Sequence, residues 1–232
     1  MSGVKVYYYS DVLCIWAYVA QRRLEQLAQD FGDQIDIEPH FVSVFPDTRT
    51  KIETNWRAKG GFAGFNKHLQ EVAKGFDHIR VHEDIWLNAR PRTSASAHLF
   101  LKAIELIEET QADGDVSVLP FLDRLSTRAA AAVRHAFFTQ GLDISERQVL
   151  ADIATELGVD ATLLNDTLQS AQAMTSLAAD YDLSQKNDVT GSPTFIMNNG
   201  RQRLFGNVGY RLLEANVHEL LSGTASHDAS WC

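Results

Sequence analysis

Cysteine is scarce in this chain of 232 residues, which contains only Cys14 and Cys232. Two cysteines this far apart give no disulfide framework. The sequence also lacks an apolar run long enough to span a bilayer, and its first residues, MSGVKVYYYSD, lack the basic and apolar regions of a secretory signal. We therefore expect a reducing, cytoplasmic compartment, in which a free thiol is available for chemistry.

Positive charge is also in short supply. The 21 Lys and Arg residues are outnumbered by 30 Asp and Glu, which gives a formal net charge of −9. This balance predicts no general affinity for nucleic acid or for an anionic membrane surface. The composition, with 45% hydrophobic and 22% charged residues, is ordinary for a globular protein of one large or two small domains.

The first forty residues predict a strand, a helix and a second strand. Residues 4–9 are β-branched and aromatic. Apolar residues spaced by three and four from residue 16 to 31 indicate a helix, which Gly32 ends. Residues 35–41 alternate as in a strand, and Pro39 within them indicates a sheet edge. The two strands are expected to be parallel, with a right-handed crossover.

The middle of the chain is predicted to be mostly helical. Residues 46–64 are expected to be irregular, because they are rich in glycine and charge. A helical pattern covers residues 125–137. Ser145 and Gln148 form a capping-box pair before the next helix, and Asp160 can cap a third.

The end of the chain returns to β structure. Residues 194–197 predict a strand, Asn199-Gly200 a hairpin turn, and residues 201–205 the return strand. A helix over residues 212–221 follows.

The most economical assembly pairs the two β-containing ends in one sheet. It predicts an α/β domain made of residues 1–45 and 185–224, a helical insertion over residues 46–184, and a frayed tail at residues 225–232.

Cys14 lies where the first predicted strand ends and the first helix begins. Ligands of open α/β sheets bind at the carboxyl ends of the parallel strands, and a helix N-terminus stabilises a thiolate, so a lowered thiol pKa is expected there. The alternative is a buried, inert cysteine. Pro193, just before the third strand, is either a cis-proline at a functional turn or a trans-proline that begins a strand.

These features together resemble a known family. "SDVLCIWAYVA" (residues 10–20) resembles the active-site segment of DsbA-like thioredoxin-fold proteins of the FrnE type, in which an aspartate precedes Cys-Pro-Trp-Cys and a tyrosine follows. The matching positions are Asp11, Cys14, Trp16 and Tyr18. Ile15 replaces the proline and Ala17 replaces the second cysteine.

The rest of the chain extends this resemblance. "TGSPTFIMNNGRQRLFGN" (residues 190–207) resembles the cis-proline loop and terminal hairpin of the family, with Pro193 at the cis-proline position. "RTSASAHLFLKA" and "AVRHAFFTQGLDISERQVLADIATELGVD" fit its helical insertion. The resemblance implies a thioredoxin-like fold (βαβ…ββα) with a large all-helical insertion.

The missing second cysteine limits the chemistry. Ala17 cannot form a disulfide with Cys14, and nothing in the sequence places Cys232 within the roughly 7 Å between Cα atoms that a disulfide needs. Three chemistries remain for a lone thiol. It can exchange with a disulfide and be released by glutathione, it can sense peroxide, or its site can bind glutathione and direct the tripeptide's own sulfur at an electrophile.

The last chemistry is that of relatives with the same architecture, the kappa-class glutathione transferases and 2-hydroxychromene-2-carboxylate isomerases, which have a serine where Cys14 stands. This resemblance implies that the backbone of Ser192 pairs with the cysteinyl unit of glutathione. It also implies that the turn with Asn207 and Val208 faces the γ-glutamyl end, although that group commonly has Asp-Arg there.

Several other residues have two interpretations. Trp16 is a wall of a substrate groove or a core residue, and Asp11 orients the active-site loop or, with more weight, caps the helix. His78 and His82 have the spacing of metal ligands on a helix, but a lone pair is a weak signal and no metal is expected.

Three basic residues are also considered for anion binding. Lys67 is a weak candidate for contact with a glutathione carboxylate. Arg90 and Arg92 are expected to be exposed and solvated rather than to bind an anionic substrate.

The sequence therefore predicts an enzyme, a thiol oxidoreductase or isomerase with Cys14 as its catalytic residue and glutathione as co-substrate. The residues assigned to substrate or glutathione binding are Trp16, Ala17, Ser192, Pro193, Asn207 and Val208. The expected partners are a protein disulfide or a small thiol or electrophile, and the resemblance implies a homodimer. The alternatives are a glutathione-dependent transferase or isomerase, and a non-catalytic binding or chaperone module.

Overall fold

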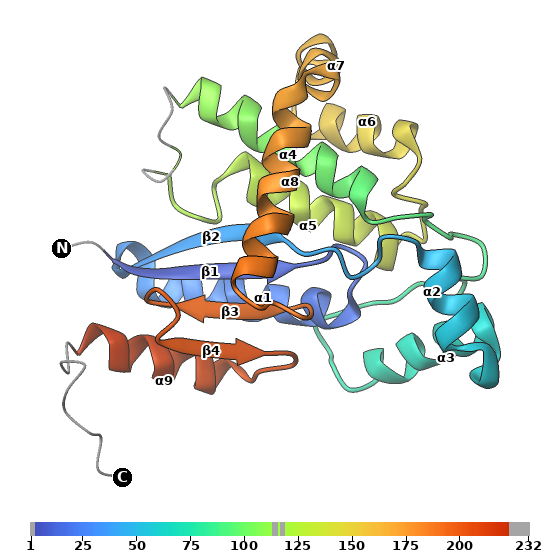
Figure 1. Ribbon diagram of the computed structural model, residues 1–232, viewed down its shortest axis with the longest axis horizontal. Helices are drawn as coiled ribbons and strands as arrows, with labels where there is room; N and C mark the ends of the chain where they lie inside the picture. The colour runs from blue at the N-terminus through green and yellow to red at the C-terminus, as the bar shows by residue number, and fades with distance from the viewer. Residues whose placement is uncertain (1–2, 113–115, 117–118, 223–232) are drawn as a thin grey trace.

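A four-stranded sheet unites the two ends of the chain in the computed structural model, which describes residues 3–112, 116 and 119–222 (Figure 1). The strands are β1 (Val4–Ser10), β2 (Ile35–Phe41), β3 (Thr194–Met197) and β4 (Gln202–Phe205). Their order is β2-β1-β3-β4, with β1 and β2 parallel and the other two pairs antiparallel. The predicted parallel pair, the edge position of the Pro39 strand and the shared sheet are confirmed.

Helices cover both faces of this sheet, and alternation along β1 decides which side chain meets which helix. Tyr8 points to the face covered by α1 (Ile15–Phe31) and α9 (Tyr210–Leu221), in a core with Leu27 and Val217. Tyr9 points to the opposite face, where it packs with Ile196 near α8 (Ala171–Lys186). Figure 1 shows α8 crossing the sheet on the side opposite to α1.

Buried charges hold α8 against β2. Asp180 of α8 accepts hydrogen bonds from the Phe41 N–H, at 3.0 Å, and from His40, at 2.8 Å. Burial alone would lower the pKa of His40, but its contacts with Asp180 and Glu38 raise it to about 9. His40 is therefore a cation at neutral pH, and it binds the helix to the sheet edge.

The segment between β2 and α8 is helical. Its α-helices are α2 (Thr48–Asn55), α3 (Gly61–Ala73), α4 (Ala95–Gln111), α5 (Leu125–Phe138), α6 (Arg147–Glu156) and α7 (Ala161–Gln169), and short 3₁₀ turns lie at Gly32–Gln34 and Arg57–Lys59. The expectation that residues 46–64 are irregular is wrong. The sequence of α2 carries little apolar periodicity, but Asp47 caps the helix by accepting a hydrogen bond from the Thr50 N–H, and Ile52 is buried in the core.

Helix ends follow the predictions in part. Asp160 caps α7 through the Leu163 N–H, and Gly32, with φ of 50°, ends α1 as expected. The capping box at Ser145 and Gln148 is wrong, because α6 has Glu146 as its N-cap and the Ser145 hydroxyl donates to Asp143 instead.

The hairpin turn is confirmed, with Asn199 and Gly200 both at positive φ between β3 and β4. One apolar core runs from the loop after β1 into the helices of the middle segment, joining Val12 and Ile15 to Phe100, Val133 and Ile153. Within the described residues, no helix has the length and apolar character needed to cross a membrane. The predicted tail and Cys232 lie outside the described residues.

Candidate active site

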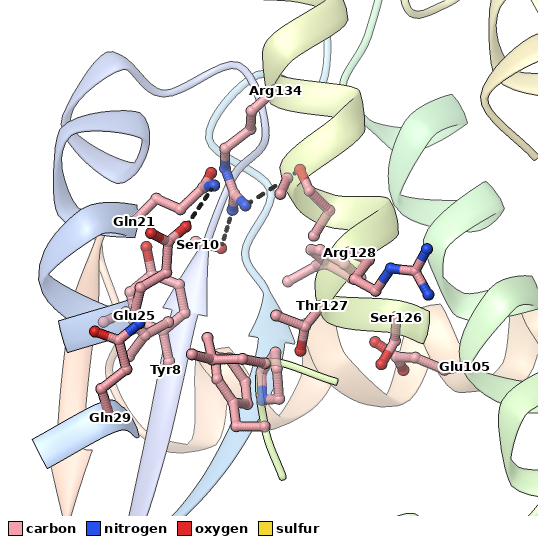
Figure 2. A pocket seen from close by; sticks show the side chains of 17 residues that line it. Tyr8, Ser10, Gln21, Glu25, Gln29, Glu105, Ser126, Thr127, Arg128 and Arg134 are labelled. Atoms are coloured by element: carbon pink, nitrogen blue, oxygen red, sulfur yellow. Dashed lines mark hydrogen bonds between the residues drawn. The ribbon is translucent and has the colours of Figure 1, made fainter. Parts of the chain in front are cut away.

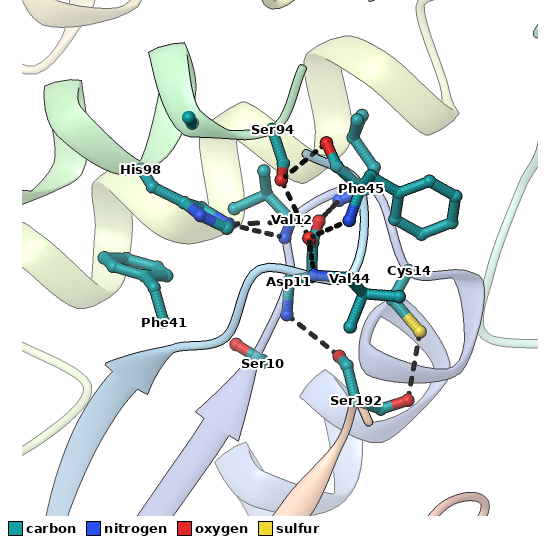
Figure 3. Close-up of polar contacts among 12 residues, drawn as sticks. Ser10, Asp11, Val12, Cys14, Phe41, Val44, Phe45, Ser94, His98 and Ser192 are labelled. Atoms are coloured by element: carbon teal, nitrogen blue, oxygen red, sulfur yellow. Dashed lines mark hydrogen bonds and ion pairs between the residues drawn. The ribbon is translucent and has the colours of Figure 1, made fainter. Parts of the chain in front are cut away.

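Cys14 is the N-cap of α1, in an extended conformation at the end of the loop that follows β1. Its Sγ lies 3.1 Å from the carbonyl oxygen of Ser192, to which the thiol donates a hydrogen bond (Figure 3). The peptide bond between Ser192 and Pro193 is cis. The fold thus brings together the two motifs that sequence analysis singled out, although 178 positions separate Cys14 from Ser192 in the chain.

The side chain of Cys14 is buried, with the residue 7% exposed. Burial raises the pKa of the thiol, because a thiolate there loses its hydration, and this outweighs the hydrogen bonds that favour the thiolate. The prediction of a lowered thiol pKa is therefore wrong. The N–H groups of Ala17 and Trp16 at the start of α1 do act in the expected direction, but desolvation is the larger effect.

The Asp11 carboxylate, which is fully buried, organises the loop that carries Cys14. One oxygen, Oδ1, accepts a hydrogen bond from the Leu13 N–H at 2.9 Å. The other, Oδ2, accepts from the N–H groups of Val44 and Phe45, each at 2.9 Å, and from the Ser94 hydroxyl at 2.8 Å. A single side chain therefore joins the end of β1 to the segment after β2 and to the start of α4 (Figure 3).

Asp11 also fixes the opposite wall of the site. Its backbone N–H donates to the Ser192 hydroxyl at 2.9 Å, so Ser192 is held by Asp11 through its side chain and by Cys14 through its carbonyl. The interpretation of Asp11 as a helix cap is wrong, since Cys14 occupies the N-cap and has no side-chain cap bond. The alternative, orientation of the loop, is what the structure contains.

His98 is fully buried behind this loop. Its Nε2 accepts a hydrogen bond from the Val12 N–H at 3.2 Å, so Nδ1 carries the proton and donates to the Tyr181 hydroxyl at 3.0 Å. Burial lowers the pKa of His98 to about 4, and the ring is neutral at physiological pH. His98 lies 3.9 Å from Oδ1 of Asp11, stacked on Phe41.

Sequence analysis gave no role to Ser94 or His98. Both lie in the stretch "RTSASAHLFLKA", where a histidine on the apolar face of a helix is a weak signal in itself. Only the tertiary structure shows that they support the loop of Cys14, because their partners lie more than 80 positions away.

The remaining predicted site residues are spread out. Trp16 is half-buried with its ring edge against Phe76, so it is partly a core residue. Ala17 is 0% exposed, which does not fit its predicted contact with a bound molecule. Its backbone carbonyl instead accepts a hydrogen bond from the Tyr8 hydroxyl.

Asn207 and Val208 lie beside Arg23 of α1. The Arg23 guanidinium donates to Oδ1 of Asn207 at 2.6 Å and to the carbonyl of Val208 at 2.8 Å. Nine residues of helix at about 1.5 Å each place Arg23 roughly 14 Å along α1 from Cys14. The turn predicted to face glutathione is therefore paired with a cation that sequence analysis did not single out.

The weaker candidates lie away from any such cluster. His78 contacts the Val19 carbonyl, and His82 accepts from the Asp84 N–H, in a segment that is not helical. No group of three or more possible metal-ligating side chains is found in the described part of the chain.

The three basic candidates for anion binding are all exposed. Lys67 lies on α3, and Arg90 lies over the ring of Phe62.

Comparisons with known proteins agree with this architecture. The family model for the DSBA-like thioredoxin domain matches residues 5–218. Among solved structures, a Nitrosomonas europaea protein proposed to be a protein disulfide isomerase shares 15% identity, with a TM-score of 0.75, over 96% of this chain and 100% of its own. The cytosolic disulfide reductase DsbM from Pseudomonas aeruginosa, solved with GSH, shares 19% identity, with a TM-score of 0.64, over 92% and 99%.

A 2-hydroxychromene-2-carboxylate isomerase shares 20% identity, with a TM-score of 0.64, over 97% of this chain and 100% of its own. At these identities, the three structures establish the fold. No curated protein matches the chain.

Replacement of Asp11 tests its place in the loop. In Asp11→Asn, at least one of the four donors that converge on the carboxylate loses its acceptor, so we expect the free energy of unfolding to fall by about 3 kcal/mol or more. Urea denaturation followed by circular dichroism measures it. Asp182→Asn, an exposed position on α8, is the matched control and should stay within about 0.5 kcal/mol. Equal stability of the two variants would contradict the assigned role.

The buried His98 predicts a pH dependence of stability. Its pKa is about 4 in the folded protein and about 6.5 in the unfolded chain, so the unfolded chain takes up the proton first on acidification. The stability that neutral His98 contributes is complete above about pH 6.5 and is lost as the pH falls towards 4. Between pH 7.5 and pH 5, we expect wild type to lose about 2 kcal/mol relative to His98→Gln.

Urea titrations of both proteins at the two pH values measure this difference. His135→Gln, at an exposed position on α5, should track wild type. A difference between wild type and His98→Gln that does not change with pH would contradict a neutral, buried His98.

Proposed function

The chain belongs to the family of DSBA-like thioredoxin domains, and from this we propose that it is a thiol–disulfide oxidoreductase or isomerase that works with one cysteine, Cys14, and with glutathione as co-substrate. The observation that carries the proposal is the position of the Cys14 sulfur, at the N-terminus of α1 and 3.1 Å from the carbonyl of Ser192 beside cis-Pro193.

The proposed reaction needs no second cysteine in the chain. The Cys14 thiolate attacks a substrate disulfide, for example one between a protein thiol and glutathione. A bond forms between Cys14 and the glutathione sulfur, and the protein thiolate leaves. The thiolate of a second glutathione then attacks the sulfur of the bound glutathione, which releases glutathione disulfide and restores the Cys14 thiolate. The protein sulfur is thereby reduced from disulfide to thiol, the sulfur of the incoming glutathione is oxidised from thiol to disulfide, and the glutathione that came with the substrate stays at the disulfide level.

Two features support an external resolving thiol. Ala17 stands where a second active-site cysteine would, and its methyl group is packed in the core. Cys14 is the free cysteine of the described residues. The Pseudomonas aeruginosa reductase of the same fold was solved with GSH and is cytosolic. Our proposal for this chain accordingly includes a cytoplasmic location. It also includes a protein disulfide as substrate and a homodimeric state.

The experiment uses Cys14→Ser, with Cys232→Ser as the matched control. We expect glutathione-dependent reduction of a glutathionylated protein to fall by about 1,000-fold or more in Cys14→Ser and to persist in Cys232→Ser. Because burial raises the thiol pKa, alkylation of Cys14 should speed up as the pH rises through the alkaline range. Turnover that survives in Cys14→Ser would overturn the proposal, and no turnover in wild type would favour a non-catalytic binding module.

A second candidate is a glutathione-dependent transferase or isomerase. The specific observation that favours it is the protonated, buried Cys14, whose S–H group donates a hydrogen bond rather than acting as a ready nucleophile. In this case the glutathione sulfur is the nucleophile. Arg23, beside Asn207 and Val208, would bind the carboxylate of the γ-glutamyl end. The 2-hydroxychromene-2-carboxylate isomerase of the same fold supports this candidate.

Glutathione binding separates the two candidates. The second candidate predicts saturable binding by calorimetry that survives in Cys14→Ser and weakens about tenfold or more in Arg23→Met, which removes a charge-assisted contact. Arg22→Met, at the neighbouring exposed position, should bind as wild type does. The absence of binding at millimolar glutathione would exclude this candidate.

A further inference from the structure

A cavity lies apart from Cys14, between the α1 face of the sheet and α5 (Figure 2). Its volume is about 300 Å³, and neither Cys14 nor Ser192 lines it. Most of its wall is apolar, with side chains from α1, β2, α5 and the segment before α5, among them Leu24, Phe41, Phe121, Leu122 and Ala131. A cavity of this size and character is at the lower end of the range that holds small organic molecules.

Arg134 of α5 points into this cavity and is 5% exposed. Its guanidinium donates to the Ser10 hydroxyl at 2.9 Å and to the Ala130 carbonyl at 3.5 Å (Figure 2). None of the ion pairs among the described residues involves Arg134. The other buried cations have carboxylate partners: Lys102 binds Glu105 and Asp180, and His40 binds Asp180 and Glu38.

An unpaired buried charge is costly, since burial removes its hydration without supplying a counter-ion. The cavity also has three buried polar atoms with no hydrogen-bond partner in the structure. They are Nε of Arg134, Oγ1 of Thr127 and Oε1 of Gln21. All three residues line the cavity, and the two donors and one acceptor are buried in its wall.

The two carboxylates on the wall of the cavity have other partners. Glu25 accepts hydrogen bonds from Gln21, at 3.0 Å, and from Arg22, at 3.5 Å. Glu105 is paired with Lys102. Neither forms an ion pair with Arg134, but their negative charge disfavours a ligand with two charges.

We propose that this cavity binds a small monocarboxylate with an apolar body. The planar guanidinium of Arg134 matches a carboxylate in geometry and charge, and the Thr127 hydroxyl is a further donor to it. The apolar wall takes the hydrocarbon part of the ligand, and Oε1 of Gln21 accepts from a hydroxyl or N–H group where the ligand has one. The bound carboxylate is the counter-ion that Arg134 lacks.

The test uses octanoate and 3-phenylpropionate as probes of an aliphatic and an aromatic body. We expect both to raise the melting temperature of wild type, and calorimetry to give saturable binding for at least one of them. The neutral amides, octanamide and 3-phenylpropionamide, should bind about 10- to 100-fold more weakly, because they lack the charge that Arg134 recognises.

Arg134→Met removes the cation and retains an apolar side chain, and it should weaken carboxylate binding to the level of the amides. Arg128→Met is the matched control, since Arg128 lies on the same helix and lines the same cavity but is exposed. Its binding should stay within about threefold of wild type. Binding should also survive in Cys14→Ser, which separates this site from the proposed thiol chemistry.

A second readout is independent of the folding of Arg134→Met. In wild type, the Nε–H signal of Arg134 in proton–nitrogen NMR spectra should shift on titration with the carboxylates, and Thr127→Val should weaken their binding. Three results would each overturn the proposal. The first is that neither carboxylate binds up to about 10 mM, roughly the weakest affinity of interest for such a site. The second is that the carboxylates and their amides bind equally well. The third is that Arg134→Met binds the carboxylates as tightly as wild type does.

Discussion

The buried carboxylate of Asp11 is the interaction on which the site depends. Four donors from three parts of the chain converge on its two oxygens, and its own N–H holds Ser192. A carboxylate removed from water is stable only when such donors satisfy it. The loop of Cys14, the segment after β2 and the start of α4 are thereby fixed to one another, and the position of Cys14 relative to Ser192 follows from that constraint.

The surroundings of Cys14 combine two opposing effects. The N-terminus of α1 favours a thiolate, whereas burial of the side chain favours the thiol, and burial has the larger effect on the pKa. A thiol of this kind is protonated and donates its hydrogen bond to the Ser192 carbonyl. This is compatible with exchange chemistry that glutathione completes, and also with a site in which the glutathione sulfur reacts.

Charge is distributed unevenly in the interior. On the α8 side of the sheet, His40 and Lys102 both pair with Asp180, and each has a second carboxylate partner, Glu38 for His40 and Glu105 for Lys102. On the α1 side, the partners of Arg134 within the described part of the chain are the Ser10 hydroxyl and the Ala130 carbonyl. Among the described residues, the fold thus contains one cluster of paired buried charges and one buried cation without a carboxylate partner.

The sequence by itself determined the features that depend on local periodicity and turn chemistry: β1, α1, β2 with Pro39 at the edge, the Asn199-Gly200 hairpin and the cap at Asp160. It also identified Cys14 and Pro193 as the two halves of one site, through a resemblance that matches nearly the whole chain. It failed at α2, which is stabilised by its cap and by Ile52 in the core rather than by a periodic pattern. The Ser145 cap failed because Asp143, two residues earlier, competes for the hydroxyl.

The tertiary structure alone decided the pKa of Cys14, the role of Asp11, the neutral state of His98 and the isolation of Arg134. Each of these properties depends on burial and on partners far away in the chain. Local sequence does not encode these properties, because desolvation and long-range hydrogen bonds exist only once the chain has folded.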